Sequence, residues 1–89
     1  MELQLDGREF VDRQLLHAAI ARQLHLPDYY GENLDALWDI LSSWNEPLTI
    51  IIHNPTRFVE QLGGYGESVL QLLQDAEEEN SMISVEYRE

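Results

Sequence analysis

Two aspartates four positions apart, Asp35 and Asp39, are the residues of this chain whose type and spacing point most directly to chemistry. In a helix their Cβ atoms lie about 5–6 Å apart, and like charges at that spacing cost about 0.2–0.5 kcal/mol. Asp35 is favoured by the positive end of the helix dipole, but Asp39 lies too far along the segment for this explanation. Trp38 borders the pair, and aromatic anchors are enriched in interface hot spots. The pattern therefore favours a recognition surface over an ordinary solvated helix face.

The same carboxylates could in principle serve as the acid and base of a glycosidase, because that chemistry needs two flanking carboxyl groups. A short chain whose acids lie on a convex helix face offers little cleft to exclude water. Ser42 and Ser43 share the acidic face, but no histidine lies in their helix to activate a nucleophile. We therefore expect a protein that is not an enzyme.

Other residues with possible chemistry predict no cofactor or metal. The three histidines lack the clustered spacing of metal ligands (His17, His25 and His53), and we expect them to be packing or surface residues. The segment Gly63-Gly64-Tyr65-Gly66 has no following Lys-Ser/Thr and so resembles no phosphate loop. It is typical of a turn between two helices.

The charge balance indicates the kind of partner. Seventeen Asp and Glu residues face only five basic residues, all Arg, so the net charge is −12 and the pI is about 4.3. Such a field repels nucleic acid and anionic membranes, and it attracts basic proteins. Solubility alone also explains an acidic surface, so the clustering of the acids is what carries information.

Length and composition favour a small globular protein. Eighty-nine residues, 44% of them hydrophobic, predict a single domain spanning residues 1–89. The absence of cysteine excludes disulfides and thiolate chemistry. No basic segment followed by an apolar run opens the sequence, and no run is long enough to span a bilayer. We therefore expect a cytoplasmic protein that is monomeric when free.

Alternating strand and helix patterns predict an α/β fold. Strands are expected at residues 2–6, 48–52 and 82–87, the central one buried on both faces because it is β-branched and uncharged. Helices are expected from Asp12 to before Pro27, over 34–43 with Asn33 as its cap, over 55–62 with Asn54 as its cap, and over 67–79. Helical crossovers between successive strands imply a three-stranded parallel sheet with about four helices.

The second and fourth helices each carry an acidic side. In the second, Asp35, Asp39, Ser42 and Ser43 lie beside a stripe of leucines; in the fourth, Asp75, Glu78 and Glu79 lie opposite the apolar stripe. If these helices pack side by side, their acids would form one patch, which remains a hypothesis at this stage.

The segment LPDYYGENLDALWD, residues 26–39, resembles the signature of the barstar family, intracellular inhibitors of bacterial ribonucleases of the barnase type. The likeness continues through Leu41 and residues 44–46, and it reappears at residues 67–71. Length, order of elements and acidity agree along essentially the whole chain. The resemblance implies a two-layer barstar-like α/β fold and a tight-binding inhibitor whose second helix and preceding loop fill a ribonuclease active site.

The resemblance also implies roles for particular residues. Asp39 would occupy the phosphate position and meet active-site Arg and His, while Asp35 would pair with another basic group. The remaining residues of the implied interface are Tyr29, Asn33, Trp38, Ser42, Trp44, Glu46 and Asp75. This sequence has Asp75 where barstar has Glu, Ser43 for Gly and Ile40 for Cys, and the segment after Glu46 is one residue shorter, which leaves the cognate ribonuclease open.

A second hypothesis has the acidic patch recognising a different basic protein, such as a toxin domain without ribonuclease activity. Failure to inhibit any guanyl-specific ribonuclease would favour this general binding module. A basic toxin encoded beside the inhibitor would favour an immunity protein, or antitoxin.

Overall fold

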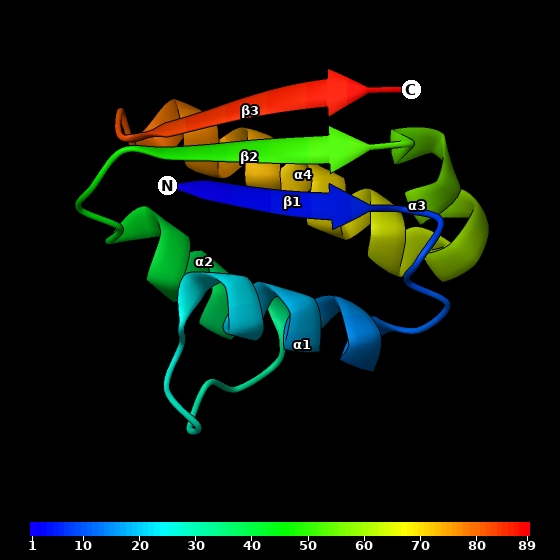
Figure 1. The fold of residues 1–89 in the computed structure, drawn as a ribbon, viewed down its shortest axis with the longest axis horizontal. Helices are drawn as coiled ribbons and strands as arrows, with labels where there is room; N and C mark the ends of the chain where they lie inside the picture. The colour runs from blue at the N-terminus through cyan, green and yellow to red at the C-terminus, as the bar shows by residue number, and fades with distance from the viewer.

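The computed structural model describes residues 1–89, and Figure 1 shows the arrangement of its elements. In chain order these are β1 (Glu2–Asp6), α1 (Arg13–Leu24), α2 (Leu34–Ser42), β2 (Leu48–His53), α3 (Pro55–Leu62), α4 (Gly64–Glu79) and β3 (Ile83–Arg88). The strands pair in parallel in the order β1-β2-β3. The predicted three-stranded parallel sheet with four helices is confirmed. No helix combines the length and the apolar composition that crossing a membrane requires.

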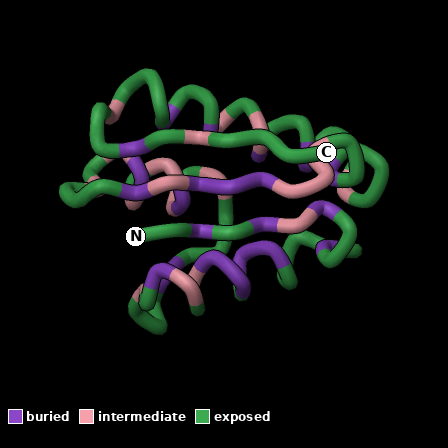
Figure 2. Tube along the Cα trace, turned by 45° about the horizontal axis from the view of Figure 1, so that its top comes forward, coloured by how far each residue is buried: buried purple, intermediate pink, exposed green.

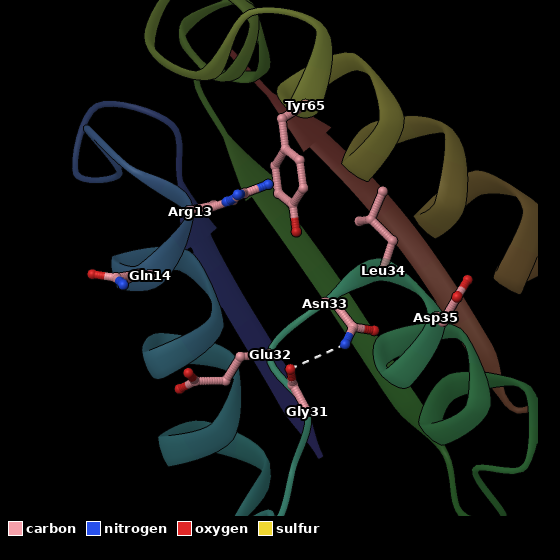
Figure 3. A pocket seen from close by; sticks show the side chains of 8 residues that line it. All are labelled: Arg13, Gln14, Gly31, Glu32, Asn33, Leu34, Asp35 and Tyr65. Atoms are coloured by element: carbon pink, nitrogen blue, oxygen red, sulfur yellow. Dashed lines mark hydrogen bonds between the residues drawn. The ribbon is translucent and has the colours of Figure 1, made fainter.

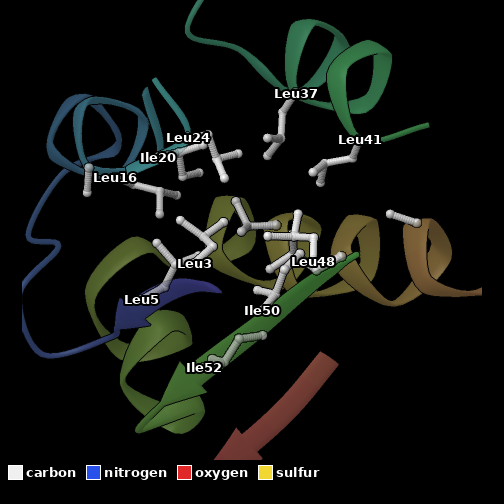
Figure 4. Packing of buried hydrophobic residues seen from close by; sticks show 14 of the residues in the cluster. Leu3, Leu5, Leu16, Ile20, Leu24, Leu37, Leu41, Leu48, Ile50 and Ile52 are labelled. Atoms are coloured by element: carbon white, nitrogen blue, oxygen red, sulfur yellow. The ribbon is translucent and has the colours of Figure 1, made fainter. Parts of the chain in front are cut away.

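The central strand β2 organises the core. Leu48, Ile50 and Ile52 point towards the helices and join a cluster of 17 buried residues to which α1, α2 and α4 all contribute (Figure 4). Ile51 has the opposite direction in the strand and is also buried, although it lies outside this cluster. The predicted burial on both faces is therefore confirmed only in part, because Thr49 and His53, which share the face of Ile51, are half-buried. β1 and β3 carry more exposed residues (Figure 2).

Side chains from two helices cover the outer edges of the sheet. Gln23 of α1 pairs with the Gln4 backbone of β1, accepting from its N–H and donating to its carbonyl, each at 2.8 Å. On the other edge, the carboxylate of Glu77 in α4 accepts a hydrogen bond from the Val85 N–H. Backbone groups of an edge strand that already have hydrogen-bond partners cannot pair with a strand of another chain. These contacts therefore protect the two outer strands of the short sheet.

Two helix caps form as the sequence predicts. Asp12 accepts a hydrogen bond from the Leu15 N–H at 2.9 Å, and Asn33 accepts one from the Ala36 N–H at 2.8 Å. Each cap satisfies a backbone donor that the first helical turn leaves unpaired. The Asn33 cap begins α2, the helix that carries Asp35 and Asp39.

The N-cap position predicted for α3 is confirmed, although the side chain there makes no capping hydrogen bond. Asn54 stands at the right position but has φ 53°, and its side chain accepts no hydrogen bond from the helix. Its amide instead donates to Asp6 at 3.0 Å, and Glu89 accepts hydrogen bonds from the N–H and hydroxyl of Thr56 in the first turn. Arg8 also binds Asp6, and this hydrogen bond holds the pKa of that carboxyl well below its usual range. Asn54 thus joins two loops.

The fourth helix begins three residues earlier than predicted, at Gly64 instead of Glu67. Only Gly63, with φ 59°, has the left-handed backbone of the expected turn. Gly64, Tyr65 and Gly66 are already helical, because the missing side chain at Gly66 lets α4 cross the backbone of Phe58 in α3 at close range. Helix contact therefore outweighs the low helix propensity of glycine.

Candidate functional site

The acidic face of α2 points outward because its opposite face is fixed in the core. Leu37 and Leu41 are fully buried, and the side chain of Asn80, which follows α4, donates hydrogen bonds to the carbonyls of Leu41 and Trp44 at 2.9 and 2.8 Å. Asp35 and Asp39 are both exposed. The core and the Asn80 contacts therefore fix the direction in which the two carboxylates face.

No basic group of the chain neutralises these carboxylates. The ion pairs of the molecule join Asp6 to Arg8, Arg57 to Glu60, and Glu86 to Arg88. None includes Asp35 or Asp39, and Asp75 only accepts a neutral hydrogen bond from Gln71 at 2.9 Å. The charges of α2 are therefore available to a partner without the breaking of an internal ion pair.

Asp35 and Asp75 lie on the same surface. α2 packs against α4, and the groove between them is lined by Leu34, Asp35, Trp38, Ser68, Gln71, Leu72 and Asp75. Trp38 is half-buried and packs against the core, so its ring is supported while one side faces the groove. The hypothesis that the acids of the second and fourth helices share a patch holds for Asp35 and Asp75, whereas Glu78 and Glu79 do not line the groove.

Asp39 lies beside a second hollow, formed by α2, its C-terminal segment and the loop that precedes it. Tyr29, Asp39, Ile40, Ser43 and Trp44 are among its lining residues. Tyr29 is 88% exposed, which is unusual for a side chain of this size, and Trp44 is half-buried. Aromatic groups of this kind supply large contact area at low entropic cost, and here they flank a carboxylate.

A third hollow adjoins the start of α2 (Figure 3). Arg13 and Gln14 of α1, residues 31–35 and Tyr65 of α4 line it. The amide of Asn33 donates to the Gly31 carbonyl at 3.1 Å, so the side chain that caps α2 also shapes the loop. Asp35 lines both this hollow and the groove beside α4, and the three depressions therefore surround α2.

Three residues of the interface implied by the resemblance either bind groups of their own segment or bind nothing in the free chain. Ser42 is half-buried, and its hydroxyl points back to the Asp39 carbonyl at 3.4 Å. Asn33 is engaged as cap and loop contact, and Glu46 is exposed without a hydrogen bond or ion pair of its side chain. All three lie within or close to the surface around α2, but only Asn33 lines one of its hollows.

Sequence reasoning missed several residues of this surface. Arg13 and Tyr65 line the third hollow, while Ser68 lines the groove next to Gln71, which the helical period already places on the side of Asp75. The period of α4 places Ser68, Gln71 and Asp75 on one side of that helix, so this signal was present in the sequence. No sequence pattern pointed to Tyr65, because its glycine-rich surroundings are typical of a turn.

The amino-acid sequence is similar to known proteins along most of its length. Residues 1–88 match the family model described as Barstar (barnase inhibitor). The protein YrdF of Bacillus subtilis (strain 168), whose naming as a ribonuclease inhibitor is provisional, is 45% identical over 76 residues, which cover 84% of this chain and 84% of YrdF. The matched region includes every residue of the surface around α2.

Proposed function

The chain belongs to the barstar family of barnase inhibitors, and from this premise we propose that it inhibits a basic ribonuclease of the barnase type by placing the acidic face of α2 in the active site. Inhibition of a ribonuclease is the role of the family, whose members are inhibitors and not enzymes. The manner of inhibition and the type of ribonuclease are the finer part of the proposal, and they rest on the surface around α2.

A single observation carries the proposal. Asp35, Asp39 and Asp75 are exposed carboxylates without a basic partner in the chain. A ribonuclease must hold phosphate groups, for which Arg and Lys are the usual ligands. These three carboxylates, two on α2 and one on α4, supply the negative charge that such a cleft otherwise takes from RNA.

Each part of the surface has a role in this proposal. Asp39, on the outward face of α2, takes the position of a phosphate, and Asp35 and Asp75 pair with basic groups on either side of their groove. Trp38 packs in that groove, while Tyr29 and Trp44 pack beside Asp39. Asn33, Ser42 and Glu46 complete the contact with hydrogen bonds at its rim, where polar residues are usual.

The net charge of −12 should accelerate association with a basic ribonuclease. Opposite fields steer two proteins together and raise association rates up to about 10⁸–10⁹ M⁻¹s⁻¹ at low salt, a range to which the barnase–barstar pair itself belongs. Fast capture matters if the ribonuclease is active where the cell keeps its own RNA. We therefore propose that the chain acts inside the cell. We also propose that it is a monomer when free.

An inhibition titration tests the proposal. Purified chain is added to barnase that cleaves a fluorogenic RNA, and the activity is expected to fall linearly to zero near one equivalent. Association is expected to slow as ionic strength rises, because salt screens opposite charges at the contact. Lysozyme, a basic protein that does not cleave RNA, serves as the control and should form no stable complex.

Two outcomes would contradict the barnase-type assignment. One is full barnase activity in the presence of excess chain. The other is equal binding of barnase and lysozyme, which would indicate a general acidic module that binds basic proteins through charge alone.

A further inference from the structure

Three side chains from separate parts of the fold form one hydrogen-bonded chain centred on a buried histidine. His17 of α1 is fully buried. Its Nδ1 lies 2.7 Å from the hydroxyl of Tyr30, in the loop before α2, and its Nε2 lies 2.6 Å from the hydroxyl of Tyr65, in α4. The histidine therefore links α4 to the 26–33 loop, although the two tyrosines share no direct hydrogen bond.

The chemistry of imidazole couples the two tyrosines. Burial lowers the pKa of His17 below its usual value, which favours the neutral ring. A neutral ring has one donor and one acceptor nitrogen, so both are satisfied only while both hydroxyls are present. Loss of either hydroxyl leaves a buried polar nitrogen unpaired, which is costly, and the effect of a change at Tyr65 reaches Tyr30 through this ring.

Tyr65 is itself held in place from outside. The guanidinium carbon of Arg13 lies 5.2 Å from the centroid of the tyrosine ring, and Figure 3 shows Arg13 reaching across to Tyr65 above the third hollow. The imidazole of His17 meets the same ring edge-on, at 73° and 6.1 Å between centroids. Cation–π and edge-to-face contacts of this kind favour one ring orientation.

The hydrogen-bonded chain reaches the 26–33 loop at Tyr30. The loop contains neither helix nor strand, and Tyr30 is its only buried residue. Tyr29, its neighbour, is 88% exposed whereas Tyr30 is 8% exposed, so one tyrosine is available to a partner while the other is held in the protein. Fixing Tyr30 inward therefore presents Tyr29 outward, beside Asp39.

We propose that Tyr65 is a positioning residue for the binding surface: through His17 and Tyr30 it holds the 26–33 loop, with Tyr29 and Asn33, in the conformation that the ribonuclease meets. The inference rests on the proposed function for the identity of the partner. Preorganisation of this kind strengthens binding because the loop need not be ordered in the complex.

The variant Tyr65→Phe tests the inference, since it removes the hydroxyl but keeps the ring on which Arg13 lies. In the free protein, amide hydrogen exchange of residues 26–33 is expected to rise about threefold to tenfold, with unchanged exchange in β2. The ring ¹⁵N signals of His17 are expected to shift. The dissociation constant for barnase is expected to rise about threefold to tenfold, as suits the loss of one buried hydrogen bond.

Tyr87→Phe is the matched control, because Tyr87 is half exposed and its hydroxyl has no hydrogen bond partner in the structure. It should leave loop exchange and binding unchanged. Unfolding of all three proteins in urea separates a local effect from a global loss of stability.

Unchanged loop exchange in Tyr65→Phe would overturn the inference, as would a rise in exchange spread evenly over the whole chain. The exchange measurement needs no ribonuclease. If the wild-type chain fails to inhibit barnase while Tyr65→Phe still loosens the loop, the proposed partner is wrong and the positioning role stands.

Discussion

The substitution Asp39→Ala is expected to weaken binding to the ribonuclease more than any other single change at the site, by at least about 30-fold. The carboxylate faces the partner unpaired, and its removal leaves basic groups of a phosphate site buried without a counter-charge, which is the costly outcome for interfacial ion pairs. The barnase–barstar pair is among the complexes in which losses of this size and larger occur. Isothermal titration or stopped-flow binding measures it.

Folding is not expected to suffer from Asp39→Ala. The Asp39 side chain makes no hydrogen bond or ion pair, and its removal relieves the repulsion from Asp35 while introducing a better helix former. Stability in urea should therefore be unchanged or slightly higher. Glu9→Ala, an exposed acid in the loop between β1 and α1, controls for the loss of one negative charge. Equal binding of Asp39→Ala and the wild type would refute the role of Asp39.

Gly66→Ala is expected to have the largest effect on stability, a loss of about 3 kcal/mol or more. An added Cβ would lie 2.2 Å from the backbone oxygen of Phe58, a residue that is fully buried. Because the obstacle is backbone in a packed helix pair, relief requires α3 and α4 to move apart. Equilibrium unfolding in urea measures this loss of stability. A variant that shows no cooperative transition would have lost its stable fold.

Gly64→Ala provides the control for Gly66→Ala within the same helix turn. An added Cβ at Gly64 meets no atom within 4 Å and the residue is helical, so alanine should stabilise the protein by about 0.4–1 kcal/mol. A Gly66→Ala protein as stable as the wild type would show that the helices do not cross so closely.

The strands and the orientation of α2 could be predicted from sequence because each is specified locally. The uncharged β-branched run at residues 48–52 permits little but a buried strand. Leu37 and Leu41, one turn apart, determine which side of α2 enters the core and hence which side displays Asp35 and Asp39. Asn33 occupies the cap position that its short polar side chain favours.

Features that depend on how distant segments meet could not be predicted. The groove shared by Asp35 and Asp75 exists because α2 packs on α4, and neither helix carries a local signal for that crossing. Asn54 occupies the N-cap position, yet its side-chain amide donates a hydrogen bond to Asp6 and its side chain makes no capping hydrogen bond. Tyr65 lies among glycines that favour a turn, whereas the structure has these residues in the first turn of α4, where Gly66 lies against the backbone of Phe58.

In the proposed complex, the acidic face of α2 occupies the site where the ribonuclease binds RNA phosphates. The most direct test of this placement is the apparent dissociation constant of the chain for barnase at increasing concentrations of a non-cleavable dinucleotide. Strict competition is expected, so the apparent dissociation constant should rise in proportion to the dinucleotide concentration once that concentration exceeds the dissociation constant of the dinucleotide. A constant that does not change, with both ligands bound to one barnase molecule, would contradict it.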